Sequence, residues 1–150
     1  MKNRATAALA VAVALAALTA CDNSDATPTK GASKPVADRL TAMSVAKRLA
    51  EATGVSTLGN PTENTASCSN KAAGTTPSKN DCAQLITTNT VSVYEFESPA
   101  VSAHWVETMK GLQQADRFAL GYSARNQSTT SDERRAELLS HLKKWVAAEK

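Results

Sequence analysis

Few side chains of this 150-residue chain are suited to acid–base, nucleophilic or metal chemistry. Its two histidines, His104 and His141, do not form the His-x-x-x-His pair that binds zinc on a helix, and the six glycines are too scattered to form a phosphate-binding loop. No Gly-x-Ser-x-Gly motif surrounds a serine nucleophile. Zinc would also need a second pair of Cys or His residues at ligand spacing, which the sequence lacks.

Two carboxylates are the remaining candidates for chemistry. Glu95 and Glu97 lie two positions apart on an expected strand, so they would share one face. Such a pair can transfer protons or bind a cation, although it more often lies on the solvent-exposed face of an edge strand. The sequence therefore predicts no catalytic residue, no bound metal and no cofactor.

Three segments with helical periodicity must position these side chains. The first, 42–53, has Thr41 as its N-cap and Gly54 just past its end. The second opens at Ser98-Pro99, with serine as cap and proline in the first turn. The third follows Thr130-Ser131-Asp132-Glu133, which resembles a capping box in which Glu133 reaches back to the cap residue. Apolar residues recur along the three segments, as Val45, Leu49 and Ala52, then Val101, Trp105, Met109 and Leu112, then Leu138, Leu142 and Trp145.

Strand patterns lie between these helices. Leu85-Ile86 and residues 90–96 are expected to form a hairpin, and slipped alternation in its second strand indicates a strand covered on both faces or bulged. Residues 117–124 place large residues on one face and small ones on the other. The face with small residues is expected to contact either solvent or a closely packed group. A further short strand is expected near Cys68. The order predicts an α+β domain with a small, mostly antiparallel sheet of three or four strands and about three helices packed on one face.

The N-terminus is built like an export signal. Lys2 and Arg4 precede a short stretch that is apolar, apart from one threonine, up to Ala17. The run Leu18-Thr19-Ala20-Cys21 follows, and it resembles the lipobox of bacterial lipoproteins. The resemblance covers residues 1–21. It implies cleavage before Cys21, a lipid on its sulfur, and anchoring at the extracytoplasmic face of the cell membrane. An ordinary cleaved signal and an uncleaved anchor are the alternatives.

Removal of residues 1–20 would leave 130 residues, which is enough for one domain. This mature chain would have 15 basic and 14 acidic residues and no basic run, which argues against a nucleic-acid partner. Lipidation of Cys21 would also leave Cys68 and Cys82 to pair in an oxidising compartment. That bridge would close a loop of about 15 residues and contribute roughly 3 kcal/mol in the chain-entropy model. Two free thiols are the alternative.

The mature chain divides into a tether and a domain. Residues 21–35 hold the lipidated cysteine and a stretch without any large apolar side chain, which predicts a flexible tether before a single domain at 36–150. Within the domain, the polar segment between the paired cysteines would be held at both ends, and such loops often carry recognition. It could equally be a variable surface loop without a partner. Its candidate interaction residues are Ser69, Asn70, Lys71, Lys79, Asn80 and Asp81.

The plan of the chain is similar to that of small, alanine-rich actinobacterial lipoproteins, which mostly lack assigned functions, so the resemblance supplies no functional residue beyond Cys21. The leading hypothesis is a non-catalytic binding module with an envelope protein as partner. The alternative is a small-molecule or lipid-binding protein with a pocket between helices and sheet, lined by Trp105 and Trp145. An enzyme would need Glu95, Glu97 or a histidine to converge in a cleft.

Overall fold

The computed structural model describes residues 39–69, 78 and 80–150. The chain divides into two units, Met1–Lys34 and Pro35–Lys150, and all of the described residues belong to the second. The expected signal peptide and tether, including Cys21, therefore lie outside the described residues. So do three of the candidate interaction residues, Asn70, Lys71 and Lys79.

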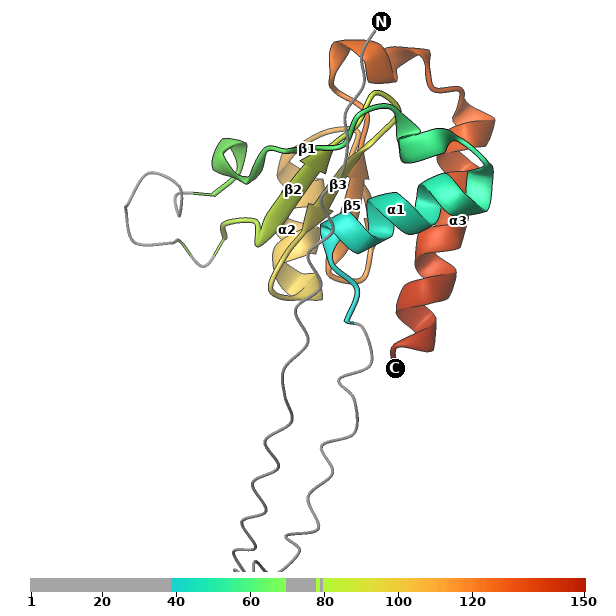
Figure 1. The fold of residues 1–150 in the computed structure, drawn as a ribbon. Coiled ribbons are helices and arrows are strands. Elements are labelled where there is room, and N and C mark those ends of the chain that lie inside the picture. The colour runs from blue at the N-terminus through green and yellow to red at the C-terminus, as the bar shows by residue number, and fades with distance from the viewer. Residues whose placement is uncertain (1–38, 70–77, 79) are drawn as a thin grey trace, which may run out of the picture. The chain divides into compact units, whose positions relative to one another are not determined.

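The described residues form an α+β fold around an open antiparallel sheet, as predicted (Figure 1). The sheet has five strands in the order β1-β2-β3-β5-β4. They are β1 Thr62–Glu63, β2 Gln84–Thr87, β3 Ser92–Glu95, β4 Gln113–Ala115 and β5 Phe118–Gly121.

The prediction of three or four strands missed the two edges of this sheet. Both edge strands are short, with two residues in β1 and three in β4, and they consist mainly of Thr, Glu and Gln. Two or three residues are too few to show an alternating pattern, so backbone pairing with β2 and β5 decides the conformation of these edges. Short polar edges also limit strand-to-strand aggregation. Cys68 itself follows a 3₁₀ helix, Thr65–Ser67, and the strand expected near it lies upstream, as β1.

Three α-helices accompany the sheet, α1 Ala42–Thr53, α2 Pro99–Thr108 and α3 Asp132–Ala148. The first two begin at the predicted caps, and α1 ends at Gly54, which has a φ of 65°. The third begins one residue later than the predicted capping box, because Ser131 accepts the hydrogen bond from the Arg134 N–H. Thr130 is engaged elsewhere, since its hydroxyl donates to the carbonyl of Thr90.

The helices lie on both faces of the sheet, and the expectation that all three cover one face is wrong. Helices α1 and α3 pack on the face that carries Ile86, Val93 and Leu120, whereas α2 packs on the face that carries Tyr94 and Ala119 (Figure 1). The physical reason is visible in β3, where all four residues are buried. A strand that places Val93 on one face and Tyr94 on the other needs cover on both sides, as its slipped alternation indicated.

A charged network joins the two ends of the domain. Glu95 is only 7% exposed, and its carboxylate accepts a 2.9 Å hydrogen bond from the N–H of Ala42 at the start of α1. The Arg117 guanidinium lies 3.8 Å from that carboxylate and 3.0 Å from Glu149, and it donates to the Leu40 carbonyl at 2.8 Å. Glu149 in turn accepts the Leu40 N–H at 2.7 Å. One guanidinium and one helix N-terminus thus balance two carboxylates.

The ionisation of Glu149 reflects these contacts. Burial acts to raise its pKa, but the hydrogen bond from the Leu40 N–H and the Arg117 guanidinium outweigh it and hold the pKa below its usual value. A carboxyl group with a depressed pKa contributes stability that is complete above the unfolded pKa and is lost as pH falls through the folded pKa. The contacts of Glu149 are therefore a source of stability at neutral pH that acid removes.

Replacing Arg117 tests how much the domain depends on this network. Arg117→Met leaves Glu95 buried without its guanidinium, and we expect the free energy of unfolding at pH 7 to fall by about 3–5 kcal/mol. Urea unfolding would measure the loss. The matched control is Arg134→Met, which breaks a more exposed pair with Glu137 and should cost about 0–1 kcal/mol. A loss at Arg117 no greater than that of the control would contradict the assigned role.

Candidate functional site

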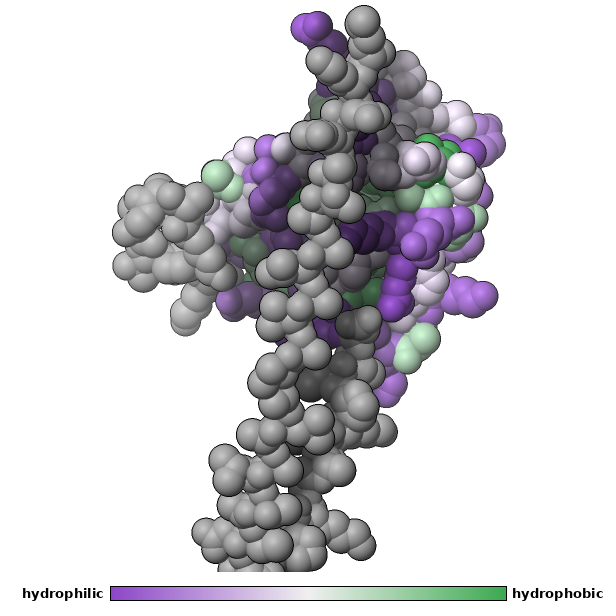
Figure 2. Space-filling model, in the orientation of Figure 1, coloured by the Kyte–Doolittle hydropathy of each residue, from purple (hydrophilic) through white to green (hydrophobic). Residues whose placement is uncertain are grey.

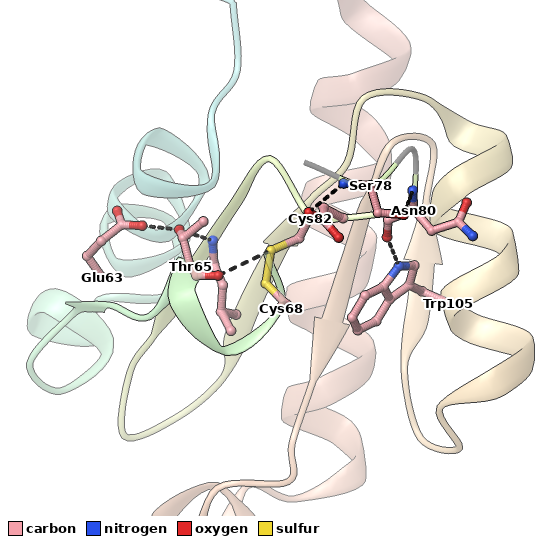
Figure 3. Close-up of a disulfide and its surroundings, with 9 residues drawn as sticks. Glu63, Thr65, Cys68, Ser78, Asn80, Cys82 and Trp105 are labelled. Atoms are coloured by element: carbon pink, nitrogen blue, oxygen red, sulfur yellow. Dashed lines mark hydrogen bonds between the residues drawn. A yellow bond between two sulfur atoms is a disulfide. The ribbon is translucent and has the colours of Figure 1, made fainter. Parts of the chain in front are cut away.

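The predicted disulfide is present. Cys68 and Cys82 are joined, with their Cα atoms 5.5 Å apart, and both cysteines are buried (Figure 3). The N–H of Cys82 also donates to the carbonyl of Cys68 at 3.0 Å. The two ends of the segment between the cysteines are therefore fixed to each other by a covalent bond and by a backbone hydrogen bond.

Side chains upstream of Cys68 attach this junction to the sheet. The Thr65 hydroxyl accepts the N–H of Leu85 in β2 at 3.0 Å and is hydrogen-bonded to Glu63 (Figure 3). Glu63 also accepts from the Gln84 side chain at 3.1 Å. The disulfide is thus held against the end of β1 and the start of β2, since the 3₁₀ helix that leads to it is bonded to both strands.

Helix α2 holds the other side of the junction. The indole N–H of Trp105 donates to the Asn80 carbonyl at 2.5 Å (Figure 3). The indole ring packs against Phe96 at 5.5 Å and Tyr94 at 6.4 Å between ring centroids. The backbone near the end of the segment is further turned by the N–H of Ser78, which donates to Asp81 at 2.9 Å. The aromatic cluster therefore positions Asn80.

A surface hollow of about 400 Å³ lies where this segment meets α2. Met109 lines this hollow and is the one large hydrophobic side chain that is exposed in the described part of the chain, at 37%. The hollow combines a carboxylate, an imidazole, an indole and a thioether within one area. We call this area the disulfide surface, and it is lined by Asn80, Asp81, His104, Trp105, Thr108 and Met109.

The structure brings some of the predicted interaction residues to this surface. Asn80 and Asp81 line the hollow, whereas Ser69 is buried beside Cys68. Sequence reasoning assigned Met109 to the apolar stripe of a helix, but α2 ends at Thr108 and Met109 has extended backbone angles. The change of backbone direction at the helix end turns its side chain outward, and no signal in the local sequence marks that residue as the end.

The other candidate side chains are dispersed. Glu95 belongs to the charged network, while Glu97 lies beyond β3 and is exposed, so the two do not share a face. His104 lines the disulfide surface, whereas His141 lies on α3 with its ring 5.7 Å from that of Trp145. Glu95 and Glu97 were expected to alternate on one strand, and β3 ends before the second of them.

The two tryptophans, which were expected to line one pocket, lie on opposite faces of the sheet. Trp105 packs on the α2 side of the sheet, and Trp145 packs on the opposite side with α1 and α3. The small-residue face of β5 is filled, because a Cβ on Gly121 would lie 2.8 Å from a methyl carbon of Leu112 and 3.1 Å from the Tyr94 ring. The small side chains therefore allow close packing there and do not open a pocket.

An apolar groove lies elsewhere, along the outer side of α1. It has a volume of about 430 Å³, and most of the residues that line it are small. On the face shown in Figure 2, apolar areas are small and separated by hydrophilic ones. The groove is lined by Ala46, Lys47, Ala50, Glu51, Gly54, Ser56, Thr57 and Pro61.

Within residues 39–69, 78 and 80–150, no three His, Cys, Asp or Glu side chains are grouped as metal ligands. No helix in the same ranges is both long enough and apolar enough to cross a membrane. The chain matches no protein-family model, and comparisons with curated proteins and with solved structures found no significant match. The arrangement of the side chains is therefore the basis for the functional proposals.

Breaking the disulfide tests its contribution to the stability of the domain. Cys68→Ser should lower the free energy of unfolding by about 2–4 kcal/mol, because the bridge restricts the unfolded chain. Thermal and urea unfolding would measure the loss, and thiol titration of the unmodified protein under denaturing conditions should find neither of these two thiols free. The double variant Cys68→Ser, Cys82→Ser controls for an unpaired thiol and should lose a similar amount. An unchanged melting temperature would contradict the prediction.

Proposed function

We propose that the mature protein is a lipoprotein held to the extracytoplasmic face of the cell membrane by lipid on Cys21. Two observations support this proposal. The run Leu18-Thr19-Ala20-Cys21 closes a segment with the features of an export signal. The disulfide between Cys68 and Cys82 is a bond that forms and persists in oxidising compartments, as expected of an exported domain.

The domain itself we propose to be a non-catalytic binding module for an envelope protein. The observation that carries this proposal is the disulfide surface, where a covalent bond and the Trp105–Asn80 hydrogen bond hold the ends of segment 69–81. A segment held in this way loses less conformational entropy on binding than a free loop. The rim adds Met109 and Trp105, and methionine and aromatic residues are enriched in protein interfaces.

The test is cross-linking of the protein in intact cells, followed by identification of the attached protein. Replacing residues 69–81 by a short Gly-Ser link should abolish the cross-linked species without unfolding the domain, as judged by thermal unfolding. The double variant His104→Ala, Met109→Ala changes the surface but keeps the disulfide and residues 69–81. It should weaken capture. Intact capture by the Gly-Ser variant would contradict the assignment of the interface.

The same experiment tests the anchor through a separate label. The unmodified protein should incorporate labelled palmitate and fractionate with membranes, and Cys21→Ser should lose both properties because it lacks the acylated sulfur. A Cys21→Ser protein that keeps the label would contradict lipidation at this residue, whatever the outcome of the cross-linking.

A small apolar ligand in the α1 groove is the second candidate function. The favouring observation is a volume of about 430 Å³, within the range of ligand pockets, lined by six small residues together with Lys47 and Glu51. Native mass spectrometry of protein extracted gently from its membrane separates the two candidates. An added mass of protein size favours the binding module, and an added mass of a few hundred daltons beyond the acyl chains favours the groove. Neither tryptophan lines the groove, so its ligand should not change tryptophan fluorescence.

A further inference from the structure

Three turns meet at the end of the sheet away from the charged network. They are the segment 56–61, the turn between β2 and β3, and the 3₁₀ helix Arg125–Thr129, which lie together at the top of Figure 1. A cleft of about 230 Å³ lies between them. Its wall is unusually rich in amides, and the principal side chains are Asn60, Thr62, Asn64, Asn89, Arg125 and Asn126.

Hydrogen bonds from a buried glutamine make this cleft rigid. Gln127 is completely buried, and its side-chain amide donates to the Thr88 carbonyl at 2.8 Å and to the Ser92 hydroxyl at 3.0 Å. Its side-chain oxygen accepts the N–H of Ala124 at 3.2 Å. The Asn126 amide then donates to the Asn89 side chain across the cleft at 3.0 Å. Polar groups on separate turns are thereby held in fixed relative positions.

The first wall of the cleft is a strained segment. Thr57, Leu58 and Asn60 have φ values of 52°, 50° and 48°, in the left-handed region that residues with a Cβ seldom adopt. The conformation is held by contacts with the β2–β3 turn, since the Leu58 carbonyl accepts the Thr90 N–H at 3.1 Å and hydroxyl at 2.8 Å. Backbone held in this way is concentrated at ligand clamps and switch regions. Here it sets Asn60 at the edge of the cleft.

Several polar groups of the cleft lack partners. Among the described residues, the side-chain amides of Asn60 and Asn64 and the guanidinium of Arg125 make no hydrogen bond or ion pair, although all three line the cleft. Asn89 and Asn126 each use one side-chain atom in their mutual bond, which leaves an N–H donor on Asn89 and an oxygen acceptor on Asn126. No acidic side chain of the described residues lines the cleft. The nearest one in sequence, Glu63, is engaged with Gln84.

The hydrogen-bonding groups and the charge of the cleft indicate which functional groups a ligand would need. A side-chain amide both donates and accepts hydrogen bonds, and so does a hydroxyl group, so converging amides match a hydroxyl-rich molecule. A guanidinium that has no carboxylate partner is suited to binding one. The volume has room for a single small unit.

We propose that this cleft binds a sugar acid, with Arg125 on the carboxylate and the four asparagines on the hydroxyl groups. This function is additional to that of the disulfide surface and independent of it, since the two sites lie at opposite ends of β2. The sugar acid is either a free monosaccharide or one unit of a polysaccharide.

Nuclear magnetic resonance of the whole ¹⁵N-labelled protein tests the proposal, because side-chain amides of asparagine are observed directly. Titration with D-glucuronate should shift the side-chain signals of Asn60 and Asn64 and saturate at roughly millimolar concentration. D-glucose, without the carboxylate, should bind about tenfold more weakly, and acetate, without the hydroxyls, should leave these signals unchanged. The methyl glycoside of glucuronate distinguishes the two sources, since a polysaccharide unit tolerates the methyl group and a site for the free sugar does not.

Two variants link binding to the residues named. Asn60→Gly keeps the left-handed backbone, removes the amide, and should weaken glucuronate binding about threefold to tenfold. Arg125→Gln should weaken it about tenfold and abolish the preference over glucose. Asn80→Ala, at the other end of β2, is the control and should bind as the unmodified protein does. Absence of saturable shifts, shifts caused equally by acetate, or binding unaffected by Asn60→Gly and Arg125→Gln would overturn the proposal.

Discussion

The described domain depends most on the ion pairs and the hydrogen bond that the Arg117 guanidinium makes. The guanidinium is shared between Glu95 in the central strand and Glu149 near the end of the chain, and it also binds the Leu40 carbonyl. Through Glu95 it is coupled to the start of α1, whose first N–H groups need an acceptor. Burying a carboxylate is costly unless such partners surround it. One side chain therefore links the first helix, the central strand, the β4–β5 turn and the end of α3.

The central strand imposes a second constraint. All four residues of β3 are buried, because α1 and α3 cover one face and α2 covers the other. A small sheet with short edge strands can bury little apolar surface on its own, and one apolar cluster would give only marginal stability. Packing on both faces supplies two such clusters. The disulfide lies beside the second of these clusters, and Trp105 connects it to α2.

The two proposed sites have different physical origins. The disulfide surface is held by a covalent bond and by the hydrogen bond from Trp105, in an aromatic cluster, to Asn80. The amide cleft is held by a buried glutamine and by backbone in the left-handed region, with unpaired donors and acceptors at its surface. The first arrangement suits a protein partner with apolar anchors, and the second suits a small polar ligand. Both lie where turns meet, at positions that regular strands and helices hold in place.

The sequence alone determined the local elements and the cysteine pairing. Helix starts such as Thr41 and Ser98-Pro99, and the hairpin of β2 and β3, follow from short-range capping and periodicity, which act within a few residues. Only the tertiary structure decided which residues that lie far apart in the chain come into contact. The edge strands exist because neighbours pair with them, and α2 packs on the second face because Tyr94 of β3 needs cover there. The Arg117 network and the amide cleft likewise join residues separated by dozens of positions, because hydrogen bonds and ion pairs between distant residues leave no periodic pattern in the sequence.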